Sequence, residues 1–415
     1  MTQQNVAEDT QTYDVGGVLL PRPFKIRRFG HFGFNVGDID AASAFYVNDL
    51  GFQVTDQADL LEELSGPVLA KARQVVTDPR MIFTSNSSDH HALLLAHRTF
   101  GTFVGNDRYA KDNTISQITF QAGSLEEVVR AEAYLRERGV RIGRVGRDMP
   151  GSNWHVYFLD PDGNTVELYY GMEQIGWNRR SKPRAMHNRG FRSLPPLPQI
   201  SEAAERAEAL ERGIDLDSGW RPAGTGQPDA YDVGGVLLPR PFKVTKLGPL
   251  SMFTEHLPEM LTFYTKVLGL EVVEESSISG ARAVFLRSGT EHHTFALVEK
   301  SVRSSLGLSE RTSCLAIGLE VGSYSQLRDA TAFLGERGHV RVELPPELYL
   351  GIDYAAHFRD PDGHLMQLYY YMEQVGWDGS PRPAAQRRVV HPTWPQTLAA
   401  LSDTYADQTF MGPLG

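Results

Sequence analysis

Three side chains in the first half of the chain, His31, Gln117 and Glu167, offer the kinds of atoms that bind divalent metals. An imidazole nitrogen, an amide oxygen and a carboxylate oxygen can all serve as ligands. Cys314 is the only cysteine, so neither an intrachain disulfide nor a cysteine-based zinc site can form. We therefore expect any metal to be held by histidine, acidic or amide side chains.

The elements that must position these residues belong to an internal repeat. The stretch YDVGGVLLPRPFK at 13–25 recurs unchanged at 231–243. Near the end of each copy, YYGMEQIGW from Tyr169 matches YYYMEQVGW from Tyr369, and the second copy is shorter in between. We predict that the piece it lacks is the helix-like insert at 58–74. Because a repeat defines the units that must pack together, it also predicts the domains.

The repeat predicts two domains, a connector and a tail. The connector contains SEAAERAEALERG, which is typical of a short, charged surface helix that Ser201 begins and Gly213 ends. The predicted boundaries are 1–177 for the first domain with the proposed metal site, 178–230 for the connector, 231–377 for the second domain without metal, and 378–415 for the tail.

Each copy is predicted to contain two βαβββ units, which makes the fold class α+β. In the first unit the strand-like GHFGFNV precedes a helix that we expect to open at Asp40 and to end at Gly51. In the second unit Ser124 and Glu127 form a capping box for a helix that closes at Gly139.

The last two strands of the second and fourth units are predicted to be joined by tight turns of sequence DPDG. Proline fixes one backbone angle, and glycine supplies a positive φ at the end of such a turn. Asp160 and Asp162 could do acid–base chemistry by residue type, but this pattern assigns them to the turn.

Superposing the four units restricts the metal site to the first copy. Glu167 lies between Val166 and Leu168, so strand alternation places its carboxylate on the opposite face, where burial requires a cation. Its equivalent in the second copy is Gln367. The equivalent first-strand positions are held by His31, Gln117, Pro249 and Ala316.

The motifs resemble those of the vicinal oxygen chelate (glyoxalase, bleomycin resistance and extradiol dioxygenase) superfamily. They are FYxxxLGF, DPDG followed by VELYY, and the paired HHALLL and HHTFAL. Among its members the chain is most similar to type I extradiol, catechol 2,3-type dioxygenases. The resemblance implies that the four units form two tandem open barrels, each a cup, and that metal sits in one cup on first-strand histidines and a last-strand glutamate.

Carried over to this chain, the resemblance matches His31 and Glu167 to metal ligands, with Gln117 where a second histidine is expected. His91 is expected on the last strand of the first unit, either as the substitute ligand or as an acid/base beside the metal, and both roles stay open. Tyr157 matches a substrate-contacting tyrosine, and His155 shares its face. His90 is expected to face the turn or solvent.

The resemblance implies an Fe(II) cofactor, with Mn, Zn or Ni as alternatives, and a catecholic aromatic substrate that is cleaved with O₂. A base takes one phenolic proton before oxygen attacks the ring. Two other functions remain open: an isomerase or lyase resembling glyoxalase I, and a metal-free binding or resistance protein. The resemblance also implies a homo-oligomer.

Composition excludes several other classes of function. The chain has 41 basic and 51 acidic residues, a formal charge of −10, and no basic cluster, which argues against nucleic acid as a partner. The polar start and the absence of an apolar run of about 18 residues argue against a membrane protein. From this we expect a soluble, cytoplasmic chain.

Overall fold

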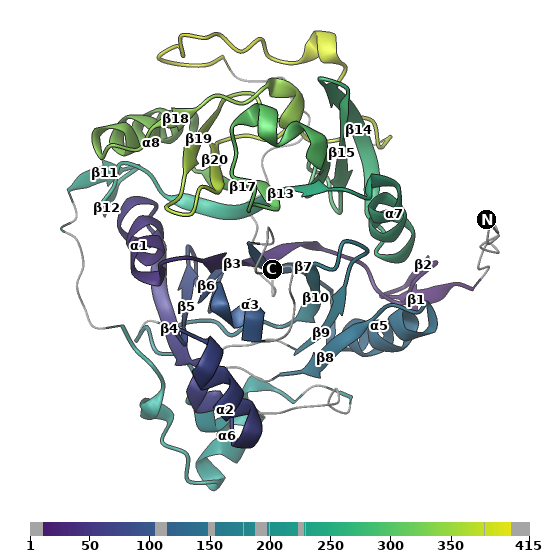
Figure 1. Cartoon of the computed structure of the whole chain (residues 1–415), viewed down its shortest axis with the longest axis vertical. Coiled ribbons are helices and arrows are strands. Elements are labelled where there is room, and N and C mark those ends of the chain that lie inside the picture. Colours follow the sequence, from purple (N-terminus) through teal and green to yellow (C-terminus); the bar gives the residue numbers. More distant parts are fainter. Residues whose placement is uncertain are drawn as a thin grey trace.

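The computed structural model describes residues 11–103, 114–147, 154–176, 178–186, 197–198, 200–222, 228, 230–376 and 378–399. The two copies of the repeat lie one above the other in Figure 1, and strands β3 and β13 run along their boundary. Each copy builds one eight-stranded sheet.

The first sheet confirms two βαβββ units in the first copy. Its central strands β3 and β7 are antiparallel, whereas β3 with β6 and β7 with β10 are parallel. The order across the sheet is β4 (Gln53–Asp59), β5 (Arg80–Ser85), β6 (Leu93–His97), β3 (Arg28–Val36), β7 (Ile115–Gln121), β10 (Thr165–Tyr170), β9 (Trp154–Leu159) and β8 (Ile142–Gly146).

The second sheet has the same strand order and pairing, so the prediction of four βαβββ units is confirmed. Edge strands in both sheets pair on one side only among the described residues, which leaves each sheet open rather than closed into a barrel. Its strands are β14 (Glu271–Ile278), β15 (Ala281–Arg287), β16 (Phe295–Glu299), β13 (Val244–Thr254), β17 (Cys314–Val321), β20 (Leu365–Tyr369), β19 (Ala355–Arg359) and β18 (Arg341–Val342).

Each unit has one helix between its first and second strands. The first and third units use α1 (Ile39–Ala44) and α7 (Leu257–Thr262), which continue as π-helical turns η1 (Phe45–Asp49) and η5 (Phe263–Val267). The second and fourth use α5 (Leu125–Glu137) and α8 (Tyr324–Glu336).

The helix cap agrees with the sequence in the second unit, and differs in the first. Ser124 accepts a hydrogen bond from the backbone of Glu127, as the capping box predicts. In the first unit the capping side chain is Asp38, which accepts from the amides of Asp40 and Ala41, so the expectation that Asp40 opens the helix was wrong. Both aspartates are good capping residues, and only the backbone geometry decides between them.

The remaining elements are short. The repeated stretch at the start of each copy forms a hairpin: β1 (Tyr13–Val15) with β2 (Val18–Leu20), and β11 (Tyr231–Val233) with β12 (Val236–Leu238). The other helices are α2 (Gly66–Val75), α3 (Thr99–Phe103) and α6 (Glu202–Glu211). The 3-10 turns are η2 (Leu60–Glu63), η3 (Arg184–Met186), η4 (Leu216–Ser218), η6 (Lys300–Val302), η7 (Ser304–Leu306), η8 (Pro346–Leu348) and η9 (Ala384–Gln386).

The two copies share one apolar core. We call the sheet face that carries α1 and α5, or α7 and α8, the joining face, and the opposite one the cup face. Phe120 of the first copy lies 6.1 Å between ring centres from Phe295 of the second, and Phe34 stacks on His364 at 4.2 Å. Because these joining-face side chains belong to a single buried cluster, the copies are expected to unfold together.

The DPDG turns add reciprocal hydrogen bonds between the copies. The hydroxyl of Tyr46 donates to Asp360 at 2.8 Å, and that of Tyr264 donates to Asp160 at 3.1 Å. Burial raises the pKa of Asp160 to about 7, although hydrogen bonds from Asn164 and Tyr264 act in the opposite direction. The aspartates therefore shape the turns, as the sequence predicts, and also fasten each copy to the other.

The connector and the tail each pack on one copy. In the connector, Lys182 pairs with Glu205 at 2.6 Å, and Arg184 donates to the backbone oxygen of Gln57 on β4 at 2.8 Å. In the tail, the ring of Trp394 lies 5.4 Å from that of Tyr354. Within the part of the chain that the structure describes, every helix is too short or too polar to cross a membrane.

Replacing the tyrosines of the reciprocal pair tests the joint between the copies. Tyr46→Phe and Tyr264→Phe each remove one buried hydrogen bond to a carboxyl group and should lower the free energy of unfolding by about 1–3 kcal/mol. Urea titration measures the loss. Tyr13→Phe, at a half-buried position of β1, is the control and should change stability by about 0.5 kcal/mol or less. Equal effects at all three positions would contradict the assignment.

The raised pKa of Asp160 predicts a pH dependence. A carboxyl whose pKa is higher in the folded than in the unfolded chain stabilises the fold most below its unfolded value, and this contribution is lost as pH rises through about 7. Between pH 5 and pH 8 the wild type should therefore lose roughly 2 kcal/mol relative to Asp160→Asn. Urea titrations of both chains at the two pH values measure the difference, and a constant difference would contradict it.

Candidate active site

A bulge in β3 turns His31 onto the cup face. Phe29 pairs with Phe120 and Phe32 pairs with Ile118, so β3 has one residue more than β7 over this stretch. Both phenylalanines can then face the joining core while His31 points to the other side. The glycine before it is required, because a Cβ on Gly30 would lie 2.4 Å from the ring of Tyr169.

Strand alternation places Glu167 on the same face. Its neighbours Val166 and Leu168 belong to the joining core, and Glu167 itself has no exposed surface. Directly opposite on β9 is Tyr157. The sequence-based orientation of Glu167 is therefore the one observed.

The structure brings His31, Gln117, Tyr157, His155 and Glu167 together. The Nε2 atom of His31 lies 2.9 Å from Oε2 of Glu167, and Nε2 of Gln117 lies 3.5 Å from the same oxygen. The hydroxyl of Tyr157 donates to Oε1 of Gln117 at 3.4 Å. Nδ1 of His155 lies 3.7 Å from Oε1 of Glu167.

The groups around Glu167 favour its ionised form. Burial alone would raise the pKa of the carboxyl, but His31, His155 and a hydrogen bond from Tyr157 together lower it below its usual value. Two buried atoms of the cluster, Nδ1 of His31 and Oε1 of Glu167, have no hydrogen-bond partner. A buried carboxylate and an imidazole with unused lone pairs are suitable ligands for a divalent ion.

His91 lies beside this cluster rather than within it. Its ring centre is 4.4 Å from that of His31, in an edge-to-face contact. Burial, together with the neighbouring His31 and His90, lowers the pKa of His91 well below its usual value, so the ring is neutral. His91 precedes β6 instead of lying on it, which differs from the sequence-based expectation.

His90 is fully buried, so the expectation that it faces the turn or solvent was wrong. Its Nε2 lies 3.1 Å from Oδ2 of Asp56, and its Nδ1 lies 2.9 Å from Nδ1 of His91. Residues 86–92 leave the strand, and strand alternation therefore does not apply to this histidine. Sequence reasoning also missed Asp56, although the repeat marks it, because an acidic residue, Glu274, stands at the matching place before His292 and His293.

The donor set of the cup face fits a metal with His31, Glu167 and the amide of Gln117. Among the described residues, no group of three or more His, Cys, Asp or Glu side chains is arranged to hold a metal ion. His31, His91 and Glu167 would be such a group. The structure places the amide of Gln117 3.5 Å from the carboxylate of Glu167, and the ring of His91 against that of His31.

The second copy has a different cup face. Its Gln367, at the place of Glu167, lies 3.0 Å from Nε2 of His357, which stands at the place of Tyr157. Burial lowers the pKa of His357 to about 4. A separate apolar cluster fills this face, with members such as Phe253, Ala316 and Leu365. This packing explains how the second sheet tolerates the absence of ligands at the matching positions.

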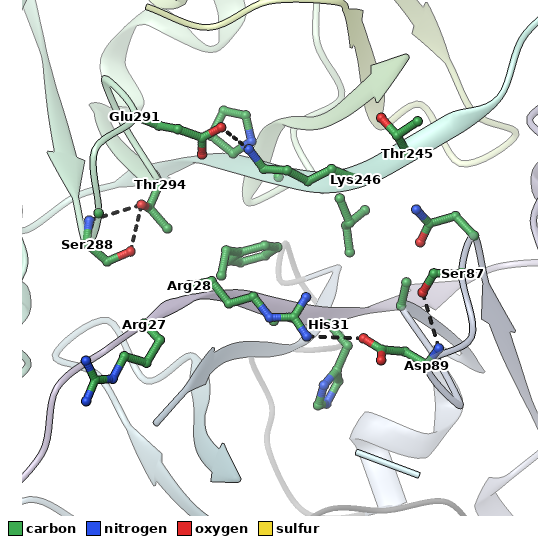
Figure 2. Close-up of a pocket in the computed structure, with 18 of the residues that line it drawn as sticks. Arg27, Arg28, His31, Ser87, Asp89, Thr245, Lys246, Ser288, Glu291 and Thr294 are labelled. Carbon is green, nitrogen blue, oxygen red and sulfur yellow. Dashed lines mark hydrogen bonds and ion pairs between the residues drawn. The ribbon is translucent and has the colours of Figure 1, made fainter. Parts of the chain in front are cut away.

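A cavity of about 550 Å³ opens between the two copies and reaches the edge of the cluster. Figure 2 shows Arg28 and Lys246 on its two facing walls, with the Arg28–Asp89 ion pair at 3.1 Å and His31 below β3. His31 and His91 are among its lining residues, whereas Gln117, Tyr157 and Glu167 are not. The cavity thus meets the candidate site only at its histidine wall.

Comparison with known proteins adds sequence and fold relationships. The chain is 23% identical over 268 residues to the catechol-2,3-dioxygenase of Bacillus subtilis (strain 168), covering 65% of this chain and 73% of that protein. The fold is similar to the 2,3-dioxygenase LapB of Pseudomonas sp. KL28, with a TM-score of 0.53 at 15% identity over 85% of this chain and 95% of that one. It is also similar to an Mn(II)-bound glyoxalase of Novosphingobium aromaticivorans, with a TM-score of 0.51 at 15% identity over 86% and 85%.

The family model named Glyoxalase/Bleomycin resistance protein/Dioxygenase superfamily matches residues 28–168 and 246–368. These two matches coincide with the two eight-stranded sheets and together cover more than half of the chain. The repeat, the βαβββ order and the family match therefore agree, and the chain belongs to the glyoxalase, bleomycin resistance protein and dioxygenase superfamily.

Proposed function

We propose that this chain is a metal-dependent extradiol-type dioxygenase that opens a catecholic ring with O₂. The observation that carries the proposal is the pairing of His31 with Glu167 at 2.9 Å on the buried cup face, with Tyr157 directly opposite Glu167. The relationship to a catechol-2,3-dioxygenase, at 23% identity, supports the dioxygenase chemistry.

His31, Glu167 and Gln117 would hold the metal. A histidine, a carboxylate and an amide suit Fe(II), and also Mn(II), Zn(II) or Ni(II). When bound, such an ion lowers the pKa of a coordinated phenol and holds the ring and O₂ together. The low pKa of Glu167 keeps the carboxylate ready to bind the ion at neutral pH.

His91 and Tyr157 supply the proton chemistry of the chain itself. A neutral imidazole can take the proton of one catechol hydroxyl and return it to the product. The phenol of Tyr157 can donate a hydrogen bond to the substrate oxygen on which negative charge develops. The guanidinium of Arg144 lies 4.3 Å from the centre of the Tyr157 ring, and its positive charge favours that donor. The ring centre of His155 lies 4.6 Å from that of Tyr157, on the same side of the site.

A second candidate function is an isomerase or lyase of the glyoxalase I type. The amide of Gln117 at a ligand position favours it, because a Gln-containing ligand set suits metals that hold a substrate without activating O₂. Oxygen consumption separates the two reactions, since only ring cleavage takes up O₂.

Metal binding is the first test. Thermal unfolding of the chelator-treated chain should shift upward on adding Fe(II) without oxygen, or Mn(II), and an ion at a hundredfold its Kd stabilises by about 2.7 kcal/mol. His31→Ala and Glu167→Gln should abolish the shift, because each removes a ligand. Gln367→Ala, at the matching place of the second copy, should leave it unchanged. A full shift in the two ligand variants would place the ion elsewhere.

Ring cleavage is the second test. The Fe(II)-loaded chain should consume O₂ when catechol is added, and Tyr157→Phe should lower kcat about a hundredfold by removing one donor to the developing charge. An oxygen electrode measures the rate. His357→Phe changes the matching residue of the second copy and should keep the wild-type rate. A metal-loaded wild type that consumes no O₂ with catechols would reject the dioxygenase and leave the isomerase.

A further inference from the structure

Three buried side chains form a hydrogen-bonded row that ends at His91. Oδ2 of Asp56 lies 3.1 Å from Nε2 of His90, and Nδ1 of His90 lies 2.9 Å from Nδ1 of His91. Asp56 is 1% exposed, His90 0% and His91 5%, so water does not compete for these bonds. The direction of each bond therefore follows from which atoms carry hydrogen.

With one hydrogen on each imidazole, the row has one consistent direction. A carboxylate only accepts hydrogen bonds, so Nε2 of His90 carries the hydrogen and donates to Asp56. With its one hydrogen on Nε2, His90 has a lone pair on Nδ1, which accepts from Nδ1–H of His91. The other nitrogen of His91, Nε2, then keeps its lone pair.

The backbone holds the row in place. The amide of Gln57 donates to Oδ1 of Asp56 at 2.7 Å, which fixes the rotation of the carboxylate. The amide of His90 donates to the backbone oxygen of Glu173 at 2.8 Å, and the hydroxyl of Thr55 donates to the backbone oxygen of His90.

We propose that Asp56 and His90 are positioning residues that hold His91 in the tautomer with hydrogen on Nδ1 and a lone pair on Nε2. That lone pair is what a proton acceptor beside His31 needs. The use of the lone pair in ring cleavage rests on the proposed function, whereas the tautomer itself is a property of the folded chain that needs no substrate.

The second copy contains a similar row without the rest of the site, and its carboxylate, Glu274, is partly exposed and also paired with Arg387 at 2.6 Å. Oε2 of Glu274 lies 2.9 Å from Nε2 of His292, and Nδ1 of His292 lies 3.1 Å from Nδ1 of His293. Nε2 of His293 is buried without a hydrogen-bond partner, as a lone pair left over from the same direction would be. Pro249 stands there at the place of His31, so this row shows the same hydrogen bonds without a metal-ligand candidate beside them.

The isosteric change Asp56→Asn tests the direction. Because the amide of Gln57 still needs an acceptor, the oxygen of the new side chain stays at that position and its NH₂ group faces Nε2 of His90. His90 must then accept at Nε2 and donate from Nδ1, so that His91 carries its hydrogen on Nε2. Glu274→Gln is the matched change in the second copy.

Long-range ¹H–¹⁵N spectra of the full chain with ¹⁵N-labelled histidine read the tautomers directly, after chelator treatment and with His91→Gln and His293→Gln for assignment. We expect His91 with hydrogen on Nδ1 in the wild type and in Glu274→Gln, and on Nε2 in Asp56→Asn. Hydrogen on Nε2 of His91 in the wild type, or an unchanged His91 in Asp56→Asn, would overturn the proposal. If Asp56→Asn does not fold, His90→Phe should give a mixture of His91 tautomers, and a single Nδ1–H form there would overturn it equally.

Catalysis supplies an independent reading. With Fe(II) and catechol, Asp56→Asn should lower kcat at least about tenfold with little change in KM, and Glu274→Gln should change neither. A wild-type chain that consumes no O₂ but shows the expected tautomers would reject the proposed function and leave the positioning inference standing. Normal turnover in a variant whose His91 tautomer has inverted would overturn the catalytic use of the lone pair.

Discussion

The candidate site of the first copy depends on the contact between the buried carboxylate of Glu167 and the imidazole of His31. Glu167 has no contact with solvent, and an ionised carboxylate in such a place is tolerated only beside positive charge or hydrogen-bond donors. The nearest donor to this carboxylate is the imidazole of His31. The bulge in β3 turns His31 toward Glu167 and keeps Phe29 and Phe32 in the core. The same bulge occurs in β13, where Gly248 and Pro249 stand at the places of Gly30 and His31, so the backbone form belongs to the repeat and the first copy uses it to place the histidine.

The two copies show how one backbone carries either a polar site or an apolar core. Both have the same strand order, the same bulge position and the same buried histidine pair. On the cup face of the second sheet, Ala316 replaces Gln117 and Gln367 replaces Glu167, and a cluster of apolar side chains closes the space. The joining faces are alike in both copies, because each contributes to the shared core. Each also takes part in the reciprocal Tyr46–Asp360 and Tyr264–Asp160 hydrogen bonds.

The repeat made most of the fold predictable from the sequence, because each unit had to bury its own helix and strands in the same way. The orientation of Glu167 and the shared face of His155 and Tyr157 followed from strand alternation, which holds inside regular strands. The same rule failed for His90 and His91, which lie in the irregular segment before β6. Asp160 is a turn residue by local sequence, but its bond to Tyr264 joins positions far apart in the chain, and no local pattern encodes such a contact.

The acid–His–His row occurs in both copies, so its structural role can be distinguished from its proposed catalytic role. Because the row is present where Pro249 replaces His31, its first role is to satisfy buried polar atoms in the segment that leads into β6 and β16. A row of rings that each carry one hydrogen and that begins at a carboxylate must nevertheless end in one nitrogen with an unused lone pair. In the second copy that nitrogen is buried without a partner, which costs stability. In the first copy the same row ends at a ring in edge contact with His31, so the segment that both copies need for packing also carries the proton acceptor that we propose beside Glu167.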